Sequence, residues 1–455
     1  MPERFTRVLV ANRGAIARRI VRACDGLGLE TVAVYSEADR DAPHLAEATQ
    51  SLPLPGVRAE ESYLNREALM AALKTSGADA LHPGYGFLAE NADFAEQVAE
   101  TGVAFIGPSP KWIRAMGDKA AARGLLADKG FPVLQASAAL DDREAALEAA
   151  ERVGYPVMLK AVGGGGGIGM RVCANPDELT AGFGQTQLMA ERAFSDARLY
   201  VELLLDRPRH IEVQLLGDGQ GNALHVYERE CSIQRRHQKL VEESPAPRID
   251  RETLIEMCDA AERVVAELGY DNVGTLETLL SSAGRFGFLE MNTRIQVEHG
   301  VTEAVTGLDL VQTQINLSQG EPLPKRPALV GHAMEARVYA EDSQRMVPST
   351  GRLTVFRPPN MFGVRVETGY QEGQLVTPYY DALLAKIIGV GDTREQAIGR
   401  VLVGLKGFMV KGVNTNIALL QRVLQDDEFI AGTLDTGFID RLLDKSTKEA
   451  KRGAN

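Results

Sequence analysis

The sequence predicts an α/β protein, with α+β character in its C-terminal part, that begins with a doubly wound parallel sheet. Three observations support this prediction. Strand and helix patterns alternate over the first hundred residues, a glycine run lies between two strand-like segments, and hairpins with longer strands follow from about residue 205. Alternation of this kind is typical of parallel sheets, which bind ligands at the carboxyl ends of their strands. The loop His82–Phe87 falls at such an end.

Apolar runs and amphipathic stretches place the individual elements. The expected early strands are 7–11, 31–35, 80–81 and 103–106, and the expected early helices are 15–27, 66–76 and 90–100. A connecting helix is expected over 110–129, and strands over 157–161 and 170–172 flank the glycine run. The proline-rich segment 321–327 predicts a surface connection to a final strand-rich part with terminal helices, and the polar end from Lys445 is expected to fray.

These boundaries predict four parts in the 455 residues. An N-terminal doubly wound domain covers 1–115, and a central region covers 116–320 and includes a compact, mobile lid at 130–204. A C-terminal mixed-sheet domain covers 330–445, and a tail covers 446–455. A typical domain has about 150 residues, so the chain is long enough for this division.

Composition excludes several classes of protein. The formal net charge of −12 argues against a general nucleic-acid binder. The four cysteines are scattered without a close pair, which argues against a disulfide scaffold or a zinc site and favours a reducing compartment. The N-terminus lacks the apolar core of a signal peptide, and no apolar run approaches the ~20 residues that span a bilayer. We therefore expect a cytoplasmic protein without a membrane or nucleic-acid partner.

The glycine run Gly163–Gly167, with Lys160 before it and Gly169 after it, is the first chemical signal. Consecutive glycines let a backbone approach a ligand and turn its N–H groups toward anionic oxygens. No GK[ST] sequence follows, so the run is not a P-loop, and the strand–turn–helix context of a dinucleotide site is missing. A flexible linker is the alternative, but the position between two strands favours a hairpin lid.

A second signal lies in two strand-like runs, 275–280 and 286–292. A turn centred on Ala283-Gly284 pairs Glu277 with Glu290 across the hairpin. Directly opposed carboxylates repel each other. A divalent cation between them relieves this repulsion, and oxygen ligands suit Mg²⁺ or Mn²⁺.

The residues after this strand form a polar row. If the strand continues, alternation places five side chains on one face: Glu290, Asn292, Arg294, Gln296 and Glu298. A solvated strand face is the alternative interpretation. The opposed acid pair in the same row instead favours a site that holds a metal beside a small oxyanion.

The segment Glu230–Lys239 is dense in hydrogen-bond donors, although such a run alone commonly marks a solvated face. Cys231 within it is expected to be a packed thiol, since no activating histidine arrangement is evident. His210 alternates with apolar residues, a pattern that by itself is more often structural than functional.

Together these segments resemble the biotin carboxylase family over about residues 4–445. The matching motifs are Val10-Ala-Asn-Arg-Gly14, His82-Pro-Gly-Tyr-Gly-Phe-Leu88, Met116-Gly-Asp-Lys119, the Lys160 glycine loop, Arg209-His-Ile-Glu-Val-Gln214, Cys231-Ser-Ile-Gln-Arg-Arg-His-Gln-Lys239 and Glu290-Met-Asn-Thr-Arg-Ile-Gln-Val-Glu-His299. The last two are the most specific. The resemblance implies an ATP-grasp fold with an N-terminal α/β domain, a mobile lid and a C-terminal domain.

The resemblance also implies roles for individual residues. The positions matching nucleotide-binding residues are Lys119, Lys160 and His210, the adenine and ribose contacts Glu202, Leu205, Gln234 and His237, and the lid glycines Gly166 and Gly167. The metal positions are Glu277, Glu290 and Asn292, and the bicarbonate pocket is Lys239, Arg294, Gln296 and Val297. Glu298 matches the general base, Arg337 the arginine that stabilises the biotin enolate, and Tyr85 a residue of the biotin pocket.

The implied reaction is the carboxylation of biotin with ATP, Mg²⁺ (or Mn²⁺) and bicarbonate, through carboxyphosphate, CO₂ and a biotin enolate. The implied partners are a biotin carboxyl carrier protein and carboxyltransferase subunits, with a homodimer as the expected assembly. The sequence leaves the final acceptor open among acetyl-CoA, propionyl-CoA and urea systems.

Four positions depart from the family pattern. The family usually has a basic residue at Ile168, and often a lysine at Leu203, a proline at Gly300 and a glutamate at Ala15. Losing two positive charges near the nucleotide affects the expected ATP affinity more than the reaction type. Another ATP-grasp ligase remains an alternative, although such ligases are not expected to share the full Arg294–His299 pocket. A non-enzymatic nucleotide-binding paralogue is a further alternative, which the intact set Lys239, Arg294, Glu298 and Arg337 disfavours.

Overall fold

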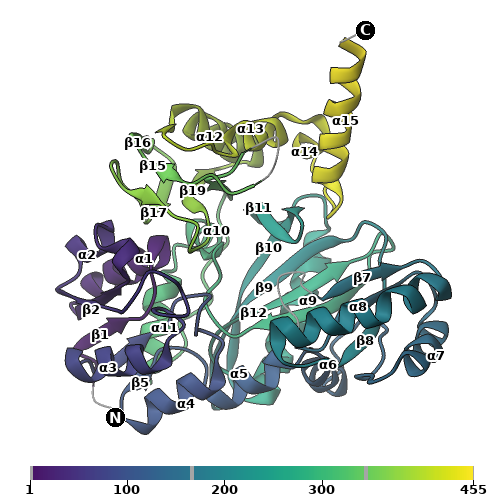
Figure 1. Cartoon of the computed structure of the whole chain (residues 1–455), viewed down its shortest axis with the longest axis horizontal. Coiled ribbons are helices and arrows are strands. Elements are labelled where there is room, and N and C mark those ends of the chain that lie inside the picture. The colour runs from purple at the N-terminus through teal and green to yellow at the C-terminus, as the bar shows by residue number, and fades with distance from the viewer. Residues whose placement is uncertain (1–3, 164–168, 343–346, 454–455) are drawn as a thin grey trace.

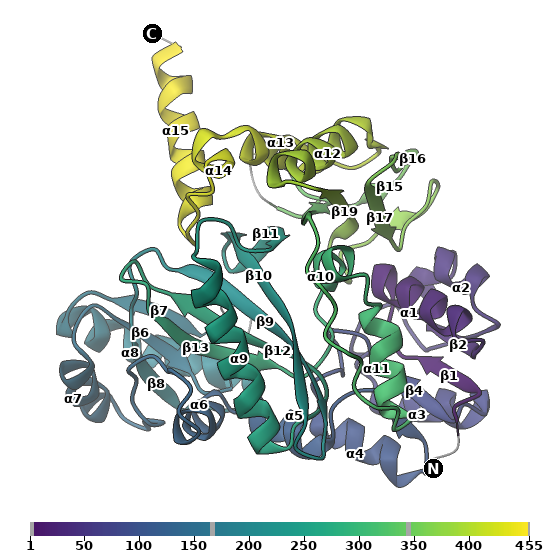
Figure 2. The same ribbon diagram turned by 180° about the vertical axis from the view of Figure 1, so that it is seen from behind.

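The computed structural model describes residues 4–163, 169–342 and 347–453 (Figure 1). The part of the glycine run at 164–168 lies outside these residues, and so do Gly166, Gly167 and Ile168. The chain begins in a parallel sheet at one side of the molecule, passes through a small lid-like unit at the other side, and ends in a helix that projects away from the body (Figures 1 and 2).

The N-terminal sheet has the order β3-β2-β1-β4-β5, and all its ladders are parallel. Its strands are β1 (Arg7–Val10), β2 (Glu30–Tyr35), β3 (Gln50–Pro53), β4 (Ala80–His82) and β5 (Ala104–Phe105). The helices around it are α1 (Gly14–Gly26), α2 (Pro43–Glu47), α3 (Arg66–Ser76) and α4 (Ala92–Glu100), with a 3₁₀ turn at Glu37–Asp39. Separate apolar cores lie on its two faces. This confirms the predicted doubly wound sheet.

Capping explains why α3 has the bounds that the sequence predicts. The Asn65 side chain accepts a hydrogen bond from the Ala68 N–H at the start, and Gly77 adopts a left-handed conformation at the end. An Asn N-cap satisfies a free helical N–H, and glycine takes a left-handed φ without steric cost.

The predicted connecting helix over 110–129 is two helices, α5 (Pro110–Gly117) and α6 (Lys119–Asp128). Asp118 between them has an extended backbone, and its carboxylate accepts hydrogen bonds from the N–H groups of Ala120 and Ala121. A strong N-cap therefore starts a new helix where continuous amphipathic spacing predicted one long helix. The break places Lys119 at the first position of α6.

The lid-like unit is a small antiparallel sheet with the order β7-β6-β8. Its elements are α7 (Arg143–Val153), β6 (Val157–Ala161), β7 (Met170–Cys173), α8 (Pro176–Phe194) and β8 (Leu199–Leu203). The helices and strands share one compact core, which is rich in alanine. The strands predicted on both sides of the glycine run are confirmed.

An eight-stranded sheet with the order β13-β12-β9-β10-β11-β14-β19-β17 joins the centre of the chain to its C-terminal part. Its strands are β9 (Arg209–Asp218), β10 (Ala223–Arg235), β11 (Gln238–Ser244), β12 (Asp271–Leu280), β13 (Phe286–Asn292), β14 (His332–Tyr339), β17 (Val364–Thr368) and β19 (Leu383–Gly391). The sequence predicted a mixed C-terminal sheet, but every ladder here is antiparallel. Hairpins and long returns connect its strands, rather than single helical crossovers.

Helices and short strands complete this half of the molecule. The helices are α9 (Arg251–Leu268), α10 (His299–Thr306), α11 (Leu310–Ser318), α12 (Arg394–Gly407), α13 (Ile417–Gln425), α14 (Asp427–Ile430) and α15 (Phe438–Gly453). The short strands are β15 (Gly351–Arg352), β16 (Val355–Arg357), β18 (Leu375–Val376) and β20 (Met409–Lys411). The core of the C-terminal part forms between the long sheet and α12 to α15.

Two terminal features complete the comparison with the sequence. The segment 321–327 has no regular structure, as predicted. The prediction of a frayed end from Lys445 is wrong for the backbone, because α15 continues to Gly453 and projects from the body (Figure 2). Across the described parts of the chain, none of the helices combines the length and the apolar character that a membrane span requires.

Candidate active site

One cavity of about 1030 Å³ lies between the parallel sheet, the lid-like unit and the long antiparallel sheet. Every site residue that the sequence predicted, and that the structure describes, lines this cavity: Tyr85, Lys119, Lys160, Glu202, Leu205, His210, Gln234, His237, Lys239, Glu277, Glu290, Asn292, Arg294, Gln296, Val297, Glu298 and Arg337. The fold therefore brings together residues that the sequence separates by about 250 positions.

The loop after β4 carries Tyr85 into the cavity. The buried Asn12 side chain, at the end of the neighbouring β1, donates through Nδ2 to the carbonyls of Pro83 at 2.6 Å and Tyr85 at 2.8 Å. Gly84 has a φ of 65°, in the left-handed region that favours glycine, and a Cβ there would lie 2.9 Å from the Asn12 amide nitrogen. Asn12 and the glycine together hold this loop at the carboxyl edge of the parallel sheet.

The predicted hairpin pairing is confirmed. Glu277 of β12 and Glu290 of β13 are cross-strand partners. The register shifts by one residue between Glu277 and the turn, so Thr278 pairs with Phe288 and Leu289 is the extra residue of a bulge. The bulge changes the register of the strands next to the turn, but Glu277 still lies opposite Glu290. Both side chains line the cavity.

The polar row is only partly the strand that the sequence predicted. β13 ends at Asn292, and the chain from Thr293 to Val297 is irregular. Glu298 is the N-cap residue of α10. The prediction of a continuous strand is therefore wrong, although Arg294, Gln296 and Glu298 all line the cavity.

Lys239 contacts three carboxylates at the centre of the site. Its Nζ lies 2.6 Å from Glu212 Oε2, 3.0 Å from Glu277 Oε1 and 2.6 Å from Glu298 Oε1. Burial disfavours the charged amine, but the three carboxylates raise the pKa of Lys239 well above its usual value. The same network holds the pKa of Glu298 below its usual range, against the effect of burial.

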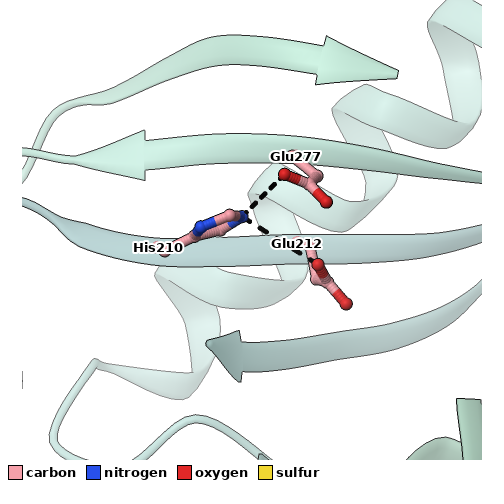
Figure 3. A group of neighbouring side chains, drawn as sticks. All are labelled: His210, Glu212 and Glu277. Atoms are coloured by element: carbon pink, nitrogen blue, oxygen red, sulfur yellow. Dashed lines mark ion pairs between the residues drawn. The ribbon is translucent and has the colours of Figure 1, made fainter. Parts of the chain in front are cut away.

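His210 lies beside two of these acids (Figure 3). Its Nε2 is 2.9 Å from Glu277 Oε2 and 3.9 Å from Glu212 Oε2. These three side chains are close enough to hold a metal ion. Burial disfavours the charged imidazolium, but the Glu277 carboxylate outweighs this effect and raises the pKa of His210 above its usual value. In this structure His210 and Glu277 form an ion pair.

The oxygen donors of Glu277, Glu290 and Asn292 fit a divalent cation better. Asn292 Nδ2 donates to Glu277 Oε1 at 2.9 Å, and Lys119 Nζ lies 2.5 Å from Glu290 Oε2. The carboxylates are thus balanced by protonated amines at the cavity wall. Carboxylate and amide oxygens are the ligands that Mg²⁺ and Mn²⁺ prefer.

Arg294 is held by a residue that the sequence did not indicate. Glu90, just before α4, accepts a hydrogen bond from Arg294 Nε at 2.8 Å. Arg294 also donates to Gln296 Oε1 at 2.9 Å and to Asn292 Oδ1 at 2.8 Å. Glu90 and Arg294 are 204 positions apart, and no local pattern could have paired them.

Arg337 of β14 contacts Glu298 and Glu242. Its Nη2 lies 3.0 Å from Glu298 Oε2 and 2.5 Å from Glu242 Oε1. Glu298 therefore lies between two cations, Lys239 on one side and Arg337 on the other. Such a carboxylate stays ionised at neutral pH.

The lid end of the cavity contains the remaining predicted residues. The buried Lys160 of β6 donates to the buried Glu202 of the adjacent β8. His237, in the turn between β10 and β11, has a pKa lowered by burial and by the charges of Lys160 and Lys119. Leu203 lines the same end, and its apolar side chain stands where a second lysine would add charge.

Comparisons with known proteins agree with this geometry. Three family models match in sequence order: "Biotin carboxylase, N-terminal domain" over residues 4–113, "Carbamoyl-phosphate synthase L chain, ATP binding domain" over 118–326, and "Biotin carboxylase C-terminal domain" over 335–441. The curated protein Biotin carboxylase 2 of Bacillus subtilis is 45% identical over 439 residues, which are 96% of this chain and 99% of that protein. The chain belongs to the biotin carboxylase family.

Other relatives support the same assignment. Biotin carboxylase of Pseudomonas aeruginosa is 45% identical over 442 residues, covering 96% of this chain and 98% of that protein. A Campylobacter jejuni biotin carboxylase structure with β-γ-ATP has a TM-score of 0.94 at 41% identity, covering 96% of this chain and 99% of that chain. The biotin carboxylase domain dimer of a Hydrogenobacter thermophilus 2-oxoglutarate carboxylase, with MgADP, ADP and bicarbonate, also has a TM-score of 0.94 at 41% identity, covering 97% and 99%. The fold is therefore the ATP-grasp fold, and the chain is a ligase of this family.

Proposed function

We propose that the cavity catalyses the ATP- and bicarbonate-dependent carboxylation of biotin. The observation that carries this proposal is the position of Glu298 between Lys239 and Arg337, in the same cavity as the paired acids Glu277 and Glu290. A base, an anion-binding lysine and a metal site then lie within one enclosed space, which the reaction of bicarbonate with a phosphoryl group requires.

We assign the nucleotide to the lid end of the cavity. Lys119 and Lys160 neutralise its phosphates, with His210 nearby; the matching lid glycines Gly166 and Gly167 lie outside the described residues. Glu202, Leu205, Gln234 and His237 surround the adenine and ribose. Glu277, Glu290 and Asn292 hold Mg²⁺ or Mn²⁺, which offsets charge on the phosphate oxygens when it is bound.

Bicarbonate is assigned to the space beside Lys239, with Arg294, Gln296 and Val297 orienting it. When the anion enters, Lys239 and Arg294 can exchange carboxylate contacts for contacts with the substrate. Glu298 then loses part of the positive field that keeps its pKa low, and it can accept the bicarbonate proton as the oxygen attacks the γ-phosphorus. Enclosure keeps water from the carboxyphosphate that forms.

Carboxyphosphate gives CO₂ and phosphate, and the phosphate takes the ureido proton of biotin. The resulting enolate is assigned to Arg337, and the biotin ring to the space beside Tyr85. Arg337 is suited to this role because its guanidinium stays charged at any physiological pH, and burial strengthens its attraction to an enolate oxygen.

We further propose the organisation of the whole protein. The proposed domains are 1–115, 116–320 with a lid at 130–204, 330–445 and a tail at 446–455; the self-contained core of residues 146–201 supports the lid. A biotin carboxyl carrier protein delivers biotin, carboxyltransferase subunits use the product, and the chain forms a homodimer in the cytoplasm. Size-exclusion chromatography with light scattering tests the dimer, and a monomer at micromolar concentration would contradict it.

The decisive experiment measures ADP release with bicarbonate and free biotin varied independently. We expect hydrolysis that requires bicarbonate and rises with biotin. Hydrolysis indifferent to both would favour another ATP-grasp ligase, and nucleotide binding without hydrolysis would favour a regulatory role.

A further inference from the structure

Two carboxylates face each other behind the cavity, outside the roles assigned above. Glu242 of β11 and Glu335 of β14 are cross-strand partners, and both side chains are fully buried. Within the described parts of the chain, none of their four carboxylate oxygens has a hydrogen bond of acceptable geometry. Their close contacts are ion pairs. A buried carboxylate without hydrogen bonds is costly in its charged form.

Each cation near this pair is shared with another acid. Arg337 Nη2 is 2.5 Å from Glu242 Oε1 but also 3.0 Å from Glu298 Oε2. Lys386 Nζ is 3.5 Å from Glu335 Oε2 but 2.6 Å from Glu367 Oε2, and it donates to the Val297 carbonyl at 2.5 Å. The two cations therefore face four carboxylates.

Other groups around the pair do not remove this imbalance. Lys239 on β11 and Tyr339 on β14 also act on Glu242, and Tyr85 in the loop after β4 acts on Glu335, whereas Arg365 on β17 and His299 on α10 act on the neighbouring Glu367. Lys239 is bound to Glu212, Glu277 and Glu298. The first turn of α10 packs close to Glu335, since a Cβ on Gly300 would lie 3.5 Å from its Oε2.

We propose that Glu242 and Glu335 are positioning residues that hold one proton between them and so keep Arg337 shared between Glu242 and Glu298. Arg337 is then available to the biotin enolate, so this inference rests on the proposed function. With the proton present, the pair carries one negative charge. Without it, the pair carries two, and Arg337 is drawn toward Glu242 and away from the substrate.

The pKa values of the two groups are consistent with this geometry. Burial raises the pKa of Glu242 to about 7, with Glu298 adding to the effect and Arg337 opposing it. Burial likewise raises the pKa of Glu335 to about 8, with Glu242 adding and Lys386 opposing. Because the groups interact, the proton belongs to the pair and not to one residue. It is present at neutral pH and is lost as the pH rises above about 8.

The test reads the proton directly, without activity. The infrared C=O band of a protonated carboxyl is titrated in the wild type and in E242Q, E335Q and the control E367Q. We expect a band at pH 7 that disappears at alkaline pH in the wild type, is missing from both E242Q and E335Q, and persists in E367Q. The control removes another buried acid that contacts Lys386.

A kinetic readout separates positioning from simple stability. In E335Q only Glu242 remains, so the pair cannot gain a second negative charge at alkaline pH, and the alkaline fall in kcat/KM for biotin should move upward by at least about one pH unit. A band unchanged in both variants, or a wild type without the band at pH 7, overturns the inference. If the bands behave as expected but the protein shows no biotin-dependent activity, the proposed function is rejected. The shared proton of the carboxylate pair is then still supported.

Discussion

Replacing Glu298 by glutamine tests the central assignment, because it removes the base and keeps the shape of the side chain. The structure indicates that the fold survives. Lys239 retains Glu212 at 2.6 Å and Glu277 at 3.0 Å, and Arg337 retains Glu242 at 2.5 Å. Neither cation is left unpaired, so we expect a loss of about 1–3 kcal/mol in unfolding free energy, the cost of one charged hydrogen-bonding partner.

The effect on turnover should be much larger than the effect on binding. Loss of a general base lowers the rate by roughly 10²–10⁴-fold. ATP is assigned to the other end of the cavity, so its affinity should change by less than about 0.7 kcal/mol, a factor of about three. Bicarbonate-dependent ADP release measures the first quantity, and calorimetric titration with a non-hydrolysable ATP analogue measures the second.

Glu212→Gln is the matched control for this substitution. Glu212 is as deeply buried as Glu298 and contacts the same lysine at the same distance of 2.6 Å, but it does not line the cavity. If Glu298 acts as the base, its variant should lose at least about tenfold more turnover than the control. Equal losses would mean that the lysine needs its counterions and that Glu298 is no base. Near-normal turnover in Glu298→Gln would refute the assignment outright.

Three further predictions follow from the site and the core. Glu277→Ala or Glu290→Ala should each raise the Mg²⁺ concentration for half-maximal activity at least about tenfold, and an unchanged requirement would contradict joint binding. Burial lowers the pKa of His44 to about 4 from an unfolded value of 6.5, so its contribution to stability is full above pH 6.5 and falls by about 3 kcal/mol as the pH drops to 4. His44→Leu should therefore flatten the loss of unfolding free energy over that range in urea titrations, and an identical pH dependence would count against it. Ile168→Arg should lower the ATP Michaelis constant by less than about tenfold, a factor that corresponds to about 1.4 kcal/mol, whereas activity appearing in an otherwise inactive protein would favour the regulatory alternative.

Local sequence patterns predicted much of the fold and part of the site. The alternation of strands and helices predicted the parallel sheet, and the bounds of α3 followed from its periodicity and caps. Pairing across the β12–β13 hairpin placed Glu277 opposite Glu290, because a short turn limits the register of its strands. These features depend on residues close together in the sequence, where spacing alone carries the information.

Only the tertiary structure decided how the charges are paired. Glu90 binds Arg294 across 204 positions, Lys386 binds the Val297 carbonyl across 89, and Arg337 lies between Glu242 and Glu298. The end of β13 at Asn292, where the strand was expected to continue, likewise depends on α10 and the sheet around it. Each of these contacts joins elements that are brought together by packing of the whole chain. Their energies depend on burial and on neighbouring charges, and neither is encoded in the local spacing of residues.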